Sequence, residues 1–219
     1  MNRVAIEGSG YYDFTGKTKV VDGVTVRQIV ATRDFGDYEK GTVGGYIQET
    51  HNLTGGAWVA DDAVAMEGAN LCYGALANKN SLIRGKASVV GGIFVTDNAV
   101  ISGKSRLMGV PGECGGNIMV AGRATIEDAT VNSPQHGDIF ICGHSVISDG
   151  AIIIGERVCV KDFSIVTEHA LITGDGSVEI SGNAQVRGGA RIITKDDYSD
   201  DMLIIGGNEH ISEPFYRPN

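Results

Sequence analysis

The 219-residue chain has little proline and no long apolar run, and both absences narrow its fold. It holds 4 prolines against 32 glycines, a balance typical of continuous strands joined by tight corners. No apolar run approaches the roughly 18 residues that a membrane-spanning helix needs. The amino terminus, MNRVAIEGSGYYDF, also lacks the apolar core of a secretory signal. These absences predict a cytoplasmic protein without a membrane partner.

The chain also lacks paired cysteines and an excess of basic charge. Its four cysteines, Cys72, Cys114, Cys142 and Cys159, show no C-x-x-C spacing, so we expect free thiols in a reducing compartment and no metal or cofactor. The formal net charge is −9. Nucleic acids and anionic membranes bind basic patches, so neither is expected as a partner.

A small residue recurs at every sixth position of the segment AWVADDAVAMEGANLCYGALANKNSLIRGKA. The set is Ala57, Ala63, Ala69, Ala75, Ser81 and Ala87. A period of six residues matches neither the 3.6-residue period of a helix nor the two-residue period of a strand. An aliphatic residue or alanine follows two positions after each small one, so each unit reads as one short strand and one corner. Such units bury their apolar face only by stacking on one another.

Three such units would close a triangular coil of 18 residues, with small side chains inside its corners and aliphatic side chains inside its walls. The sequence therefore predicts an all-β, single-stranded parallel β-helix. The residues expected to point inward are Val59, Ala63, Leu71, Ala75, Ile83, Ala87, Val89, Val95, Ala99, Ile101, Ile147, Ala151, Ile153 and Val186.

The units VADDAV, IRGKAS, VTDNAV and ISGKSR resemble the hexapeptide repeat of left-handed parallel β-helices. The left hand of the coil is what this resemblance implies. Proteins with this repeat include trimeric acyltransferases, so the resemblance also makes acyl transfer an alternative activity.

The rhythm divides the chain into three parts. Residues 1–56 lack it and are expected to form an amino-terminal strand and cap, residues 57–193 the β-helix, and residues 194–219 a tail or cap. Loops are expected at 109–117 and 132–138, where Pro and Gly interrupt the repeat. Arg157 and Phe163 fall on positions meant for small residues, so we expect distorted corners or a shifted register there.

The entry segment carries a second resemblance. Its order RDF, KG, GGYI, NL and then AWV resembles the YdcK-like family of bacterial and prophage-associated β-helix proteins, with Tyr46 where that family usually has Trp. The resemblance implies a β-helix and a prophage origin, and it implies no activity.

Apolar residues also recur on the outside of the predicted coil. They form two neighbouring columns, which are predicted to be an oligomer interface: Trp58, Leu76 and Phe94, then Cys72, Val90 and Met108. Packing of such columns side by side favours a homotrimer. The alternative is that the cap or the tail folds back over them.

The sequence predicts no catalytic residue. A catalytic base of the acyltransferase type would be a histidine, and His136 and His144 are the candidates because one falls in a loop and one at a corner. Neither has a carboxylate at a recognisable spacing. The acidic loop KDDYSDD lacks the spacing of a calcium site. We therefore expect a non-catalytic structural or protein-interaction module of unknown partner. The alternatives are an acyltransferase and a trimeric protein that binds a small ligand.

Overall fold

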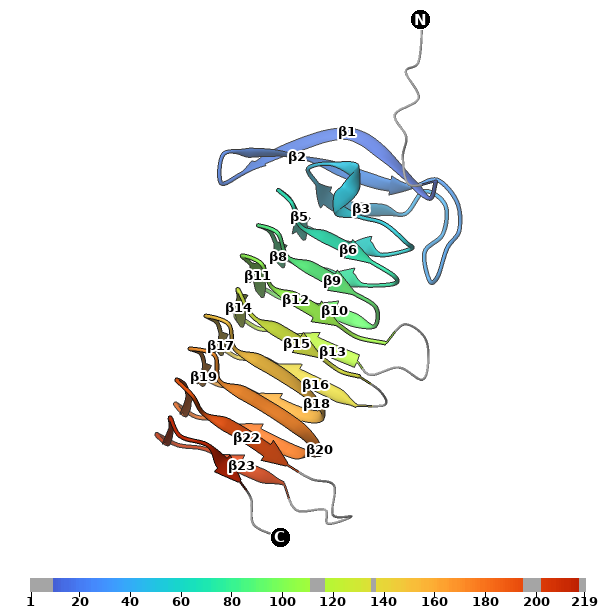
Figure 1. The fold of residues 1–219 in the computed structure, drawn as a ribbon. Helices are drawn as coiled ribbons and strands as arrows, with labels where there is room; N and C mark the ends of the chain where they lie inside the picture. Colours follow the sequence, from blue (N-terminus) through green and yellow to red (C-terminus); the bar gives the residue numbers. More distant parts are fainter. Residues whose placement is uncertain (1–9, 111–116, 135–136, 195–201, 217–219) are drawn as a thin grey trace, which may run out of the picture.

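The structure is a computed structural model that describes residues 10–110, 117–134, 137–194 and 202–216. These residues form a parallel β-helix whose coils stack into a rod (Figure 1). No α-helix occurs among them, and none of their segments is a helix long and apolar enough to cross a membrane. The predicted all-β parallel β-helix is confirmed. The left hand of the coil stays a prediction from the resemblance.

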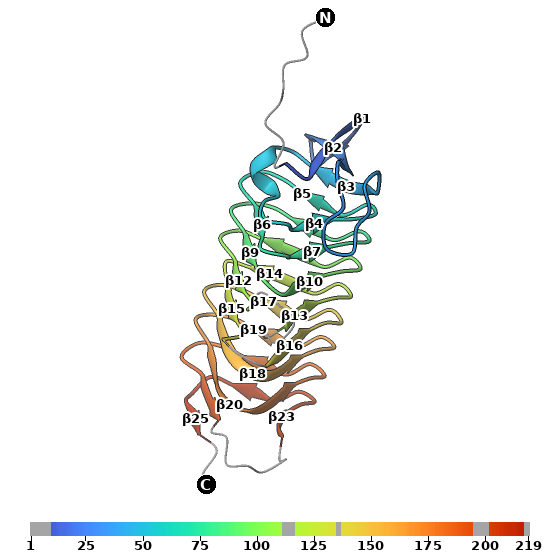
Figure 2. The ribbon, with the colours of Figure 1, turned by 90° about the vertical axis from the view of Figure 1, so that its right-hand side faces the viewer.

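The rod has three walls, and each coil contributes one short strand to each wall (Figure 2). Wall one is β3 (Val43–Ile47), β5 (Val64–Ala65), β8 (Leu82–Ile83), β11 (Val100–Ser102), β14 (Thr125–Glu127), β17 (Val146–Ile147), β19 (Ile165–Val166), β21 (Gln185–Val186) and β24 (His210–Ile211).

Walls two and three share their last long strands. Wall two is β4 (Trp58–Val59), β7 (Leu76–Ala77), β10 (Ile93–Val95), β13 (Asn117–Val120), β16 (Asp138–Ile141), the second halves of β18 (Ile152–Val160) and β20 (Leu171–Ile180), and β23 (Leu203–Ile205). Wall three is β6 (Asn70–Cys72), β9 (Ser88–Val90), β12 (Arg106–Met108), β15 (Thr130–Asn132), the first halves of β18 and β20, β22 (Arg191–Thr194) and β25 (Phe215–Tyr216).

The small residues lie inside the corners, as predicted. Ala57, Ala63, Ala69, Ala75 and Ser81 are fully buried, and all of the residues expected to point inward are buried as well. Each wall packs its aliphatic side chains against the other two walls, so the core is one continuous apolar column. In the upper coils each residue pairs with the one 18 positions later, as Trp58 does with Leu76.

The ends of the β-helix differ from the predicted boundaries. β3 already pairs in parallel with β5, with Tyr46 beside Val64, so the first coil begins inside the segment expected to be a cap. The cap proper is the antiparallel pair β1 (Tyr12–Val21) and β2 (Val24–Ala31), which crosses the top of the rod (Figure 1). At the other end, β23, β24 and β25 add a last coil where a tail was expected.

The predicted register fails at Arg157 and Phe163, and both side chains lie outside. In β18 the corner between walls three and two has no turn, so the strand continues through it. Its register with β20 shifts between Gly155 and Arg157, where β20 has one residue more. At the next corner Ser164 occupies the inner position, fully buried, and Phe163 is 60% exposed. The alternative of a shifted register is therefore the correct one.

Candidate functional site: an apolar groove along wall two

Trp58, the first residue of the predicted interface, is covered by the chain's own cap. Its side chain is 1% exposed. The loop after β2 brings Phe35 and Tyr38 over the indole, with ring centroids 5.3 and 5.2 Å from it. The alternative that the cap folds over the apolar column therefore holds for Trp58, which is not available as the anchor of an interface.

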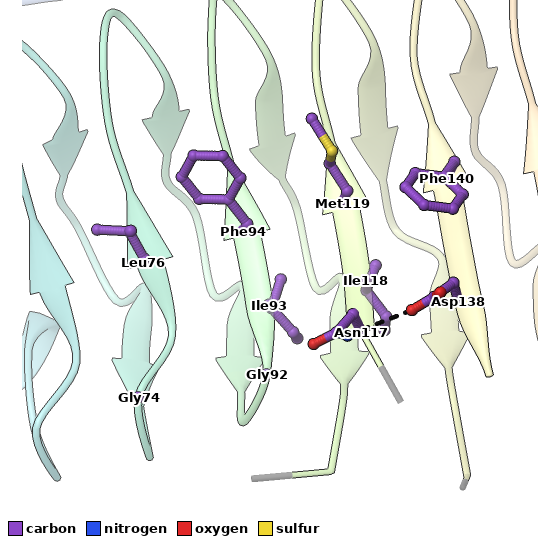
Figure 3. Close-up of a pocket in the computed structure, with 10 residues that line it drawn as sticks. All are labelled: Gly74, Leu76, Gly92, Ile93, Phe94, Asn117, Ile118, Met119, Asp138 and Phe140. Atoms are coloured by element: carbon purple, nitrogen blue, oxygen red, sulfur yellow. Dashed lines mark hydrogen bonds between the residues drawn. The ribbon is translucent and has the colours of Figure 1, made fainter. Parts of the chain in front are cut away.

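The other residues of this column are not covered. Leu76 and Phe94 lie side by side on the outer face of wall two, and the column continues through Met119 to Phe140 (Figure 3). Cys159 follows Phe140 in the register. We call these five residues the apolar ladder. Phe140 is 44% exposed, and the other four are half-buried.

The sequence analysis missed the lower half of this ladder because the loops change the spacing. Phe94 pairs with Leu76 18 positions earlier, but with Met119 25 positions later. The available signal was the inward pair Ile118 and Val120, which flanks Met119 and fixes its side of the strand.

The second predicted column runs along wall three and is shorter. Cys72 is buried, Val90 is half-buried and Met108 is 41% exposed. Asn132 follows Met108 in the register and interrupts the apolar column, which resumes at Ile154. These three residues flank the ladder without extending its length.

The ladder lies in a groove that runs parallel to the axis of the rod. A hollow of about 530 Å³ extends from Gly74 and Leu76 to Asp138 and Phe140. A second, of about 230 Å³, shares Asp138 and Phe140 with it and reaches Met202. A third, of about 190 Å³, shares Gly74 and Leu76 and ends under Phe35 and Tyr38. Because neighbouring hollows share lining residues, the three follow one another along wall two, and we call them together the groove.

One edge of the groove changes from small to large residues along the rod. We call this edge the rim, and its described members are Gly74, Gly92, Asn117, Asp138 and Arg157. The two glycines leave the upper part hollow. Asn117 donates from its side-chain amide to the Asp138 carboxylate at 3.3 Å, which holds the charge at the rim (Figure 3).

The histidines named as candidate bases do not build a catalytic group. His136 lies outside the described residues. His144 is exposed at a corner and stacks on Phe163, with ring centroids 4.9 Å apart. This contact is apolar and does not orient the imidazole for proton transfer, which needs a hydrogen-bonded partner.

A polar cluster on another corner has a structural explanation. The Asp149 carboxylate accepts hydrogen bonds from the Ser148 and Thr167 hydroxyls, both at 2.9 Å. The hydroxyls of Thr167 and then Ser148 lower the pKa of Asp149. The depression beside it, about 490 Å³, is open and also holds Lys104 and His169. Because the bond from Thr167 to Asp149 joins successive coils, the cluster links one corner to the next.

The described thiols and acidic side chains build neither a nucleophilic site nor a metal site. Cys72, Cys142 and Cys159 are free, and burial raises the pKa of each thiol, which makes them poor nucleophiles at neutral pH. Cys114 and the acidic loop KDDYSDD lie outside the described residues. Within the described part of the chain, no group of three His, Cys, Asp or Glu side chains could hold a metal ion.

The chain matches no protein-family model and no curated protein. The resemblance to the YdcK-like family therefore remains a prediction from the entry segment, and the functional argument rests on the groove.

Proposed function

We propose that this protein is a non-catalytic interaction module that uses the groove of wall two to bind another protein surface. The observation that carries the proposal is the apolar ladder from Leu76 to Cys159, aligned on neighbouring strands of one rigid wall. Leu76 packs against the core cluster that contains Trp58, but the residues below it do not, because the core lies on the opposite side of each strand.

Trp58 supports this interpretation from within the same column. The chain covers this one position with its own Phe35 and Tyr38. Aromatic residues and Met with few charges are typical of the core of a protein interface. We therefore propose that another protein surface covers the ladder in the same way as the cap covers Trp58.

Two parts of the proposal rest on the sequence alone. The resemblance of the entry segment to the YdcK-like family supports a β-helix protein of prophage origin. The cysteines, which show no C-x-x-C spacing, support a reducing, cytoplasmic location. The alternatives of acyl transfer and small-ligand binding gain no support from the described histidines.

Photocrosslinking in native cells tests the proposal. A benzophenone amino acid replaces Phe94 in one variant and the exposed Phe163, on a corner away from the groove, in the matched control. We expect protein adducts from position 94 at least fivefold above those from position 163. Equal or absent adducts at position 94 would contradict the proposed binding face.

A further inference from the structure

We propose that the groove of wall two binds a second copy of this chain, with the two rods antiparallel and a twofold axis passing beside Met119. This inference rests on the proposed function and names its partner. It depends on three properties of the groove: the order of residues in the ladder, the order of residues in the rim, and the length of the wall.

The apolar ladder is symmetric about its middle residue, Met119, because a Phe lies on each side of it and a smaller residue lies at each end. In order along the rod it reads Leu76, Phe94, Met119, Phe140 and Cys159. A twofold axis beside Met119 sets Phe94 against Phe140 of the partner subunit, and it does so twice. Paired aromatic rings at an interface add stabilisation beyond their buried area. The ladder can therefore serve as its own partner when one copy is reversed.

When one copy is reversed in this way, the rim of one copy is complementary in shape to the rim of the other. Reversal about Asn117 sets Asp138 opposite Gly92 of the partner subunit, and Arg157 opposite Gly74 of the partner subunit. Each larger, charged side chain then meets the corner where a glycine leaves the groove hollow. A parallel arrangement, including the predicted homotrimer, sets each level against the same level. It does not bring Arg157 opposite Gly74.

The wall is large enough for a stable pair. Reversal about Met119 overlaps seven levels of the rod, and at each end Phe35 and Tyr38, which cover Trp58, face Glu179 of the partner subunit. With strands about 4.8 Å apart and about six residues across a wall, the overlap is roughly 29 Å by 20 Å. This is about 600 Å² from each copy, or about 1,200 Å² in total, which reaches the lower limit of standard interfaces.

A charge-swap experiment tests the pairing of Phe94 with Phe140. Phe94→Glu alone and Phe140→Lys alone should each weaken the dimer at least a hundredfold, as measured by sedimentation equilibrium. The double variant, Phe94→Glu with Phe140→Lys, should recover most of that loss, because Glu then faces Lys twice. In a parallel assembly like charges would face each other, and the double variant would stay dissociated.

Spin labels at exposed positions test the same geometry without altering the groove. Asn80, Arg123 and Asn183 lie at corresponding exposed corners at three levels of the rod, and each is replaced by a labelled Cys in turn. The antiparallel pair predicts the shortest distance between labels at 123, with axial offsets of about 19 Å at 80 and about 29 Å at 183. Three equal distances would overturn the antiparallel arrangement.

If no distance between labels is detected and the mass is that of a monomer, the proposed self-association is wrong. In that case an adduct of position 94 with a different protein would leave the proposed function standing. The absence of both would remove the inference and the proposed function together.

Discussion

Tyr38 lies over Trp58, with ring centroids 5.2 Å apart and the rings inclined by 36°. The two residues come from the cap loop and from the first strand of wall two, so this contact joins the cap to the rod. It also hides the only Trp of the chain from water. The environment of Trp58 therefore reports on the cap.

Replacement of Tyr38 by Ala should expose the indole of Trp58. We expect the maximum of Trp fluorescence to move to longer wavelength, because water would replace the phenol ring. Tyr73→Ala is the matched control, since Tyr73 is exposed and makes no ring contact with Trp58 among those that the structure describes. An unchanged spectrum in Tyr38→Ala would contradict the observed packing of the cap.

The two glycines of the segment GGYI allow β3 to approach β4 and the first corner. A Cβ atom at Gly45 would lie 2.6 Å from the backbone oxygen of Ala63 and 2.8 Å from the Val59 side chain. We expect Gly45→Ala to lower the free energy of unfolding by about 1–3 kcal/mol through overpacking, as measured by urea denaturation. Gly189→Ala is the control, because a Cβ atom there meets nothing within 4 Å. Equal midpoints would refute the explanation.

Ala75 lies fully buried at an inner corner. Replacement by Leu would place three more carbon atoms where two walls meet, and we expect a loss of about 1–3 kcal/mol in the free energy of unfolding. Asn98→Leu, on an exposed outer corner, should change it by less than about 0.5 kcal/mol. Thermal unfolding followed by circular dichroism distinguishes the two. Similar losses in both variants would count against the small-residue rule.

Glu67 makes the stability of the upper coils depend on pH. The Gly85 amide donates to its carboxylate at 2.7 Å and Arg84 pairs with it at 2.9 Å, and these contacts lower the pKa of Glu67 below its usual value of 4.5. A carboxylate with a lowered pKa in the folded state stabilises the protein above its unfolded pKa. That contribution is lost as the pH falls through the folded pKa.

Glu67→Gln should therefore reduce the unfolding midpoint at pH 7 and make it fall less between pH 5 and pH 3 than in the wild type. Exposed Glu39→Gln is the control and should leave the pH profile unchanged. If Glu67→Gln kept the wild-type slope below pH 5, the carboxylate contacts would not be the source of the acid dependence.

The inside of the β-helix could be predicted from the sequence, and part of its outside could not. In the upper coils the inner corners hold small side chains, so Ala63, Ala75 and Ala87 indicate the corner positions. At one corner the column of Ala75 continues with larger buried residues, Ile93, Ile118 and Ile139. The repeat predicted Phe163 at an inner corner, but the register is shifted there by one residue. A one-residue shift exchanges the inner and outer faces of a strand. Only the packing shows that the neighbouring Ser164 occupies the corner.

The groove depends on contacts between residues that the sequence does not space evenly. Met119 and Phe140 join the ladder because segments of different length between coils return the chain to the same wall. The cover over Trp58 depends on the path of the cap loop, which contains no repeat. A periodic pattern predicts neither feature.

Hydroxyl-radical footprinting of the purified protein tests most directly whether the groove of wall two is a covered interface. In the single chain the exposed fractions of Phe140 and Phe163 are similar, 44% and 60%, so a free groove would give similar rates of oxidation. We expect Phe140 to react at least fivefold more slowly than Phe163 at concentrations where the mass is twice the 23.0 kDa of one chain. Comparable rates at the two residues would contradict the account.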